Sequence, residues 1–242
     1  MALPIGEFSQ RCGINATTLR AGQRRYGLLT PRRTEGGHRL YSNEDVELAL
    51  KILDWIKKGV PISQVRPLLS RPEQGQANNW LQLQELMLEL LKAGKTEALR
   101  QQIYSAGRDY PRSELVTELL RPLRSKFSAR VPAMMTLREI LDGIIITYTA
   151  FCLDKDRKSR GDNYLISGWQ LADPGEVWLE ALKRSGGNYR FDVLPQVPDT
   201  LALEVVAGRR WLLVTHGTLT SSMSRQAAQW QQQGVALEII TL

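Results

Sequence analysis

The N-terminal segment, residues 1–41, constrains the fold more than any other part of the chain. Residues 4–11 place apolar side chains at the spacing of a short helix, and a glycine-containing turn follows. Asn15 is a favourable N-cap for a second helix, which Gly27 is placed to end. Residues 29–41 are typical of a hairpin with Gly36-Gly37 at its turn. Helix, turn, helix and hairpin in this order predict a winged helix-turn-helix.

The positive charge of the chain is concentrated in the same segment. The whole chain has a formal net charge of +7, and residues 1–40 hold a surplus of five positive charges, all from arginine. Arginine suits forked contacts to phosphate and guanine, so the segment predicts a polyanionic partner. A helix sized for the major groove beside a basic wing specifies that partner as double-stranded DNA.

Particular side chains are candidates for contacting DNA. The exposed face of a recognition helix needs small polar and basic residues to reach base edges, and a wing needs donors that bind phosphates. The predicted DNA-binding residues are Thr17, Arg20, Gln23, Arg24, Arg25, Arg33, His38, Arg39 and Tyr41. Alternatively, the arginines only solvate a helix face, but that reading does not explain the arginines of the hairpin.

The head is expected to continue to residue 70. Residues 42–45 have the pattern of a capping box and open a helix that carries Val46, Leu50, Leu53 and Ile56 at helical spacing. A shorter helix begins near Pro61, and residues 70–76 have the composition of a linker. The DNA-binding domain is therefore predicted to span residues 1–70.

Two further domains are expected. Residues 76–156 hold apolar stripes at helical spacing, broken at Gly94, Pro111 and near Pro132, which predicts a bundle of four or five helices. Residues 161–242 alternate strands with helices, which predicts a small Rossmann-like domain with a parallel sheet. The predicted fold class is multidomain α and α/β.

Other functional classes find little support in the sequence. The two cysteines, Cys12 and Cys152, lie far apart and outside any Cys/His cluster, so we predict neither a metal site nor a disulfide. The chain shows no phosphate-binding glycine loop, nucleophile elbow or recognisable carboxylate pair, so we predict no enzyme, no catalytic residue and no cofactor. It lacks a signal-peptide pattern, and its most apolar stretch, residues 144–146, is too short for a membrane span, which indicates a cytoplasmic protein.

The head resembles the MerR family of transcriptional regulators. The resemblance rests on Thr18-Leu19-Arg20, Gly27-Leu28-Leu29, Gly37-His38-Arg39-Leu40-Tyr41 and Ile56-x-x-Gly59-x-Pro61-Ile62. It is closer to the MlrA-like subgroup through residues 24–29 and 34–40. The resemblance implies a homodimer that distorts promoter DNA so that RNA polymerase can engage it. The subgroup further implies control of biofilm or curli genes and a regulatory protein partner linked to cyclic-di-GMP signalling.

Two departures from related sequences keep alternatives open. Gly22 stands where the relatives usually carry an aromatic residue, and glycine inside a helix costs roughly 1 kcal/mol against alanine, so weaker binding or altered operator choice is expected. Some relatives carry a cobalamin-binding tail whose histidine ligand lies after the first strand. Residues 170–175 contain no histidine, so the tail is expected to be a degenerate form of that fold. A repressor that senses a small molecule between bundle and sheet is the alternative, and an enzyme with a DNA-binding head is a third possibility.

Overall fold

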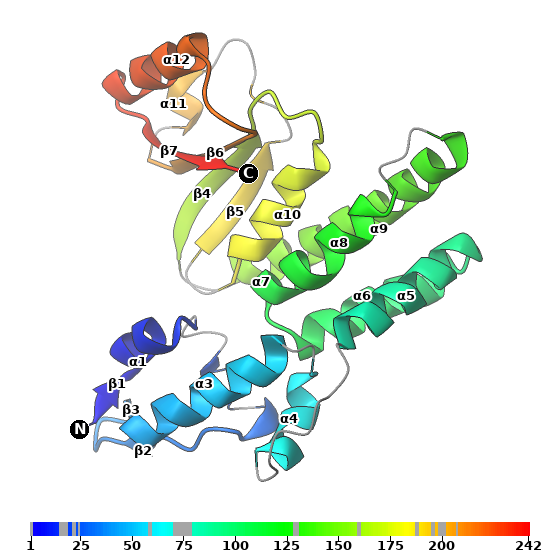
Figure 1. The fold of residues 1–242 in the computed structure, drawn as a ribbon. Helices are drawn as coiled ribbons and strands as arrows, with labels where there is room; N and C mark the ends of the chain where they lie inside the picture. Colours follow the sequence, from blue (N-terminus) through cyan, green and yellow to red (C-terminus); the bar gives the residue numbers. More distant parts are fainter. Residues whose placement is uncertain are drawn as a thin grey trace. The chain divides into compact units, whose positions relative to one another are not determined.

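The architecture is shown by a computed structural model (Figure 1). It describes residues 2–14, 19–20, 23, 25–57, 60–69, 79–127, 131–158, 161–186, 189–194, 197, 202–206 and 208–242. The chain divides into two compact units, Met1–Leu141 and Asp142–Leu242. The expected linker, residues 70–76, lies outside the described residues, and so does Gly22. The division into three domains stays a prediction. No helix in the described ranges is long and apolar enough to cross a membrane.

The first unit begins with a small sheet around one helix. Strand β1 (Leu3–Pro4), helix α1 (Ile5–Cys12), strand β2 (Arg32–Arg33) and strand β3 (Arg39–Tyr41) form it, with the antiparallel strand order β1-β3-β2. The hairpin turns where the sequence predicts: Gly37 adopts a φ of 78° and donates its N–H to the carbonyl of Thr34 at 2.9 Å. The sequence analysis missed β1, because two residues are too few to display strand alternation.

The next helices complete the head. Helix α3 (Asn43–Lys57) begins at the predicted capping box: the Ser42 N–H donates to Asp45 Oδ2 at 2.7 Å, and the Asp45 N–H donates to Ser42 Oγ at 3.1 Å. Helix α4 (Ile62–Leu68) follows. The stripe expected on α3 was partly wrong, because Leu50 is 48% exposed. The buried residues of α3 are Ala49, Ile52, Trp55 and Ile56.

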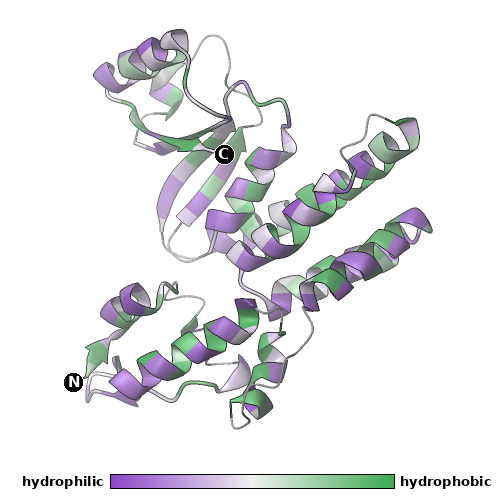
Figure 2. Cartoon of the chain, in the orientation of Figure 1, coloured by the Kyte–Doolittle hydropathy of each residue, from purple (hydrophilic) through white to green (hydrophobic). Residues whose placement is uncertain are grey.

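The middle of the chain is helical, as predicted. Its elements are α5 (Asn79–Lys92), α6 (Thr96–Asp109), α7 (Arg112–Glu114), the π-helical η1 (Leu115–Leu120), α8 (Arg121–Ser125) and α9 (Pro132–Arg157). The breaks fall at Gly94, which adopts a φ of 67°, at Pro111, and before Pro132. Polar and apolar residues alternate along these helices (Figure 2), which is the pattern of helices that bury one face.

Hydrogen bonds join the head to this helical region within the first unit. The indole Nε1 of Trp80 donates to the carbonyl of Lys57, at the end of α3, at 3.2 Å. The hydroxyl of Tyr26 donates to the carbonyl of Arg108 near the end of α6 at 3.1 Å. Trp80 also packs on Tyr110 with ring centroids 4.2 Å apart. The start of α5 and the last turn of the second helix are therefore both hydrogen-bonded to neighbouring elements.

The second unit contains the predicted parallel sheet. Its strands are β4 (Asp162–Gly168), β5 (Tyr189–Leu194), β6 (Arg210–Thr215) and β7 (Ala236–Thr241), all parallel, in the order β5-β4-β6-β7. Helices α10 (Gly175–Arg184), α11 (Leu203–Val206) and α12 (Ser221–Gln232) connect them. The sequence predicts this alternation of parallel strands and helices, and the observed strand order is that of a doubly wound sheet.

Separate cores cover the two faces of this sheet. On one face, Leu153 of α9 and Val177 of α10 pack with Tyr164 and Ile166. On the other face, Trp230 of α12 packs in a cluster that includes Trp211, and the Trp211 indole N–H donates to Ser167 Oγ at 2.8 Å. The tryptophans of the sheet are therefore packing residues.

Candidate nucleic-acid interface

The second helix presents basic residues to solvent. Leu19, Arg20, Gln23, Arg25 and Tyr26 are helical, and among them Arg20 and Arg25 are exposed while Leu19 is buried. The helix ends at Gly27, which adopts a φ of 60° and donates its N–H to the carbonyl of Gln23 at 3.0 Å. The predicted contacts Thr17 and Arg24 lie outside the described residues, so their roles stay predictions.

The wing carries two arginines directly opposite each other. Arg33 on β2 pairs with Arg39 on β3, so their side chains lie on the same face of the ladder. Like charges directly opposite each other on a sheet are unfavourable. Within the part of the chain that the structure describes, neither arginine forms an ion pair with a carboxylate. This face therefore has an uncompensated positive charge, which an anion would neutralise.

Two neighbours of this pair are also exposed on the wing, although Arg32 lies on the other face of the ladder. His38 is exposed and donates its backbone N–H to Thr34 Oγ1 at 3.1 Å, which holds the turn and leaves the imidazole toward solvent. Arg32 is also exposed, opposite Leu40, and was not among the predicted contacts. The Arg32-Arg33 doublet is the feature of the sequence that could have identified it.

A side-chain hydrogen bond joins the helix to the wing. Arg39 donates from Nε to Gln23 Oε1 at 2.8 Å, across sixteen residues of sequence. Both side chains are half-buried. The structure thus brings together two predicted DNA-binding residues from different elements, an arrangement that sequence spacing alone does not reveal.

Tyr41 lies in the core of the head. Its side chain is 1% exposed, and its ring stacks on Phe8 with centroids 4.0 Å apart. Burial raises the pKa of Tyr41, while the charges of Arg39 and Arg20 oppose that rise and Asp45 adds to it. The hydroxyl has no hydrogen-bond partner among the described residues. A phosphate contact by Tyr41 stays a prediction, and it requires the hydroxyl to leave this enclosed position.

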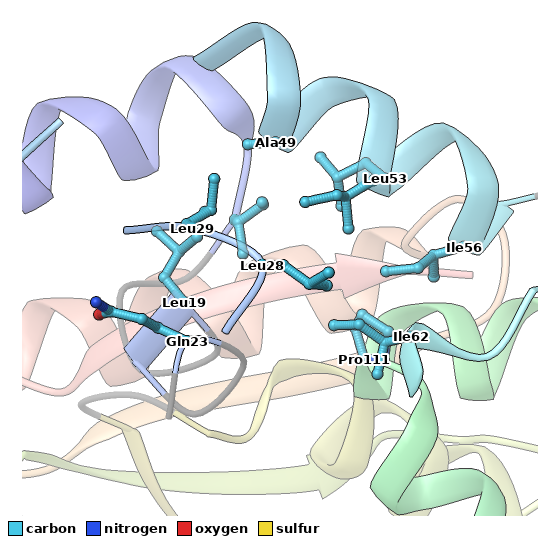
Figure 3. A pocket seen from close by; sticks show the side chains of 11 residues that line it. Leu19, Gln23, Leu28, Leu29, Ala49, Leu53, Ile56, Ile62 and Pro111 are labelled. Atoms are coloured by element: carbon cyan, nitrogen blue, oxygen red, sulfur yellow. The ribbon is translucent and has the colours of Figure 1, made fainter. Parts of the chain in front are cut away.

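An apolar pocket lies between the second helix and α3 (Figure 3). Its lining residues are Ile14, Leu19, Gln23, Leu28, Leu29, Ala49, Ile52, Leu53, Ile56, Ile62 and Pro111. Gln23 is the polar member of this lining, and Figure 3 shows its amide pointing away from the apolar side chains. The stem of Gln23 thus belongs to the core, while its amide reaches Arg39.

The described residues offer few side chains that could bind a metal or a cofactor. No group of three or more His, Cys, Asp or Glu side chains there could hold a metal ion. Cys12 and Cys152 are both buried and reduced, and burial raises the pKa of the Cys12 thiol. The loop that follows β4, residues 170–175, contains no histidine.

Comparison with known proteins covers nearly the whole chain. Residues 3–71 match the model described as MerR HTH family regulatory protein, residues 80–154 the helical domain of transcriptional regulator MlrA, and residues 161–237 its C-terminal domain. The HTH-type transcriptional regulator MlrA of Escherichia coli (strain K12) is 41% identical over 230 residues, 95% of each chain. MlrA of Salmonella typhimurium (strain SL1344) is 40% identical over the same length. The HTH-type transcriptional repressor CarH of Myxococcus xanthus is 37% identical over 71 residues, which cover 29% of this chain and 24% of CarH.

Proposed function

The chain belongs to the MerR family of helix-turn-helix transcriptional regulators, in its MlrA-type branch, and on that premise we propose that it binds promoter DNA as a homodimer and activates transcription. The second helix enters the major groove, and the wing grips the adjacent backbone. The proposed contacts are Thr17, Arg20, Gln23, Arg24, Arg25, Arg33, His38 and Arg39. For Tyr41, its enclosed hydroxyl favours a supporting role in the core.

The observation that carries this proposal is the arginine pair of the wing. Arg33 and Arg39 lie opposite each other without a carboxylate partner in the described ranges. A protein without an anionic ligand gains nothing from that arrangement, because opposed like charges are destabilising. A phosphodiester between them reverses the sign of the interaction, and guanidinium groups bind phosphate through several donors at once.

The proposed mode of activation is promoter distortion. Two heads of a dimer hold the backbone on both sides of a pseudo-palindromic site, so binding energy can bend and untwist the duplex between them. The distorted promoter is then engaged by RNA polymerase. On this proposal the protein is cytoplasmic and bound to DNA. Its helical and Rossmann-like regions are where a regulatory signal acts. We further propose, as the resemblance to the MlrA-like subgroup implies, that the targets are biofilm or curli genes and that a regulatory partner from cyclic-di-GMP signalling controls the protein.

A salt titration of duplex binding tests the proposal. Arg39→Ala in the full chain should weaken binding to all duplexes about equally and reduce the slope of log affinity against log salt by about 0.9, the contribution of one phosphate contact. Arg225→Ala is the matched control, because Arg225 is exposed on α12 and donates to the carbonyl of Ser221 in its own helix. An unchanged slope for Arg39→Ala would remove the wing from the interface. Equal binding of wild type to duplex and to heparin at moderate salt would contradict DNA recognition altogether.

Genome-wide mapping of occupied sites followed by footprinting tests the finer assignments. Occupancy at promoters with overlong spacers, and protection on both flanks of a two-fold site, are expected for a dimeric activator. Occupancy that blocks the polymerase site and lowers transcription would instead identify a repressor.

A further inference from the structure

Gln23 occupies an unusual position for a residue of a recognition helix. Its stem lines the apolar pocket beside Leu19, and its amide oxygen accepts the Nε–H of Arg39 at 2.8 Å. The side chain is half-buried, and Figure 3 shows the amide at the edge of the apolar cluster, pointing out of it. Packing of the stem restricts the rotamers available to the side chain, so the amide oxygen is held where Arg39 meets it.

The hydrogen bond leaves the binding capacity of Arg39 almost intact. A guanidinium has five N–H donors, and Gln23 engages the single one on Nε. The two terminal amino groups remain for a phosphate. Gln23 is also neutral, so it fixes Arg39 without cancelling the positive charge, which a carboxylate in the same place would do.

The Arg39 guanidinium needs a fixed hydrogen-bond acceptor because its surroundings are positively charged. Arg33 lies directly opposite on β2, and Arg20 and Arg39 both lie near enough to Tyr41 to act on its hydroxyl electrostatically. Mutual repulsion would drive the flexible arginine away from the face where a phosphate binds. A fixed neutral acceptor offsets that repulsion before DNA arrives.

The same bond conflicts with base reading by Gln23. Glutamine specifies adenine through a bidentate contact that uses both its amide oxygen and its amide nitrogen. In this structure the oxygen is committed to Arg39. A base contact of that kind would require the helix–wing bond to break.

We infer that Gln23 is a positioning residue, which holds the Arg39 guanidinium against the DNA backbone and does not read bases. The inference rests on the proposed function, because it assumes that Arg39 binds a phosphate. On this inference Gln23 does not contact a DNA base. It connects the recognition helix to the wing. Gln23 then contributes affinity for every duplex and no preference among sequences.

A double-mutant cycle on duplex binding tests this role. The variants are Gln23→Met, Arg39→Met and their combination in the full chain, because methionine keeps the apolar stem and removes the polar group. The probes are a duplex selected by the wild type from a random-sequence pool and a scrambled duplex of equal length. Gln82→Met is the control, since Gln82 is exposed on α5.

The expected result is a loss that depends on Arg39. Gln23→Met should weaken binding to both duplexes by the same factor, about three- to tenfold, the net value of one ordinary hydrogen bond. In the Arg39→Met background the same substitution should change affinity hardly at all. If Gln23→Met does not fold, as judged by circular dichroism, Gln23→Leu takes its place, because it also keeps an apolar stem and removes the acceptor oxygen, and the same dependence on Arg39 is expected of it.

Two results would overturn the inference. A larger loss on the selected duplex than on the scrambled one would make Gln23 a base reader. Independent, additive losses for the two residues would show that Gln23 does not act through Arg39. Failure of the proposed function looks different: there the wild type does not prefer duplex, or Arg39→Met by itself leaves affinity and salt dependence unchanged.

Discussion

Removal of the Tyr41 hydroxyl is expected to stabilise the protein. The side chain is 1% exposed, and its ring lies nearly parallel to Phe8, with an interplanar angle of 18°. The hydroxyl oxygen is enclosed and has no hydrogen-bond partner in the described part of the chain. Tyr41→Phe keeps the stacked ring and deletes only this oxygen, so it removes a desolvated polar group without opening a sizeable cavity.

The magnitude follows from the cost of an unpaired polar atom. A buried donor or acceptor without a partner costs about 1–3 kcal/mol. The lower end applies to Tyr41, because Arg39 and Arg20 lie near enough to attract the oxygen. The free energy of unfolding should therefore rise by about 1 kcal/mol, which raises Tm by roughly 2–4 °C for a unit of this size. Burial raises the pKa of Tyr41, so the phenol stays neutral throughout the measurement.

Tyr26 supplies the matched control. Its hydroxyl donates to the Arg108 carbonyl at 3.1 Å, so Tyr26→Phe deletes the same atom from a bonded position. That variant should lose about 0.5–1.5 kcal/mol, the net value of an ordinary hydrogen bond. Urea unfolding of both full-length variants, followed by circular dichroism without DNA, should give shifts of opposite sign.

Two outcomes would refute this reasoning. A loss of stability in Tyr41→Phe comparable to that in Tyr26→Phe would mean that the Tyr41 hydroxyl has a partner in the folded protein. A tenfold loss of duplex affinity in Tyr41→Phe, with stability unchanged, would mean that the hydroxyl reaches a phosphate, as the sequence pattern predicts.

Three further substitutions test other parts of the fold. Asp109 is the last residue of α6, and burial raises its pKa while the charge of Arg108 partly offsets the rise. The folded state therefore binds this proton more tightly than the unfolded state does. The free energy of unfolding should then fall as the pH rises above 3.8 toward the raised pKa. Asp109→Asn should therefore raise urea stability at pH 7 by about 0.5–1 kcal/mol, and the gain should vanish in acid; a constant gain would contradict the burial argument. Ser167→Ala leaves the buried Trp211 N–H unpaired and should cost about 1–3 kcal/mol, whereas the exposed Ser222→Ala on α12 should change little, and equal effects would contradict the buried bond. Gly27→Ala forces a side chain into the left-handed region and should cost about 1 kcal/mol by the same assay, even though no atom lies within 4 Å of the added Cβ; an unchanged midpoint would mean that the helix ends differently.

The elements that the sequence predicts correctly have local causes. The start of α3 depends on Ser42 and Asp45, three residues apart, and their side chains make the expected reciprocal bonds. The end of the second helix depends on Gly27, which takes the positive φ that glycine allows. The strands of the second unit are short apolar runs between turn residues. Each of these features depends on a few neighbouring residues, which is why the structure agrees with the predictions.

The features that sequence reasoning missed depend on contacts between distant residues. Strand β1 forms because Leu3 and Pro4 pair with Tyr41 and Leu40. A segment of two residues is too short to show a pattern that would predict this pairing. Leu50 fits a helical stripe by spacing, yet the face of α3 that is covered runs through Ala49. The Gln23–Arg39 bond joins positions whose separation gives no hint of contact. Residue type predicted a basic surface, whereas the tertiary fold determines which arginine is held in place.

The C-terminal sheet bears on which ligands the second unit can hold. In a doubly wound sheet, ligands usually bind outside the carboxyl ends of the strands where the chain reverses direction, here next to the ends of β4 and β6. Trp169, the first residue after β4, is 5% exposed and packs its indole against Trp230. Its backbone N–H donates to the Val214 carbonyl of β6 at 2.8 Å. That side chain is therefore committed to the core and is not available to a ligand. With no histidine in the loop that follows, the residues at this point do not suit a corrinoid held through histidine.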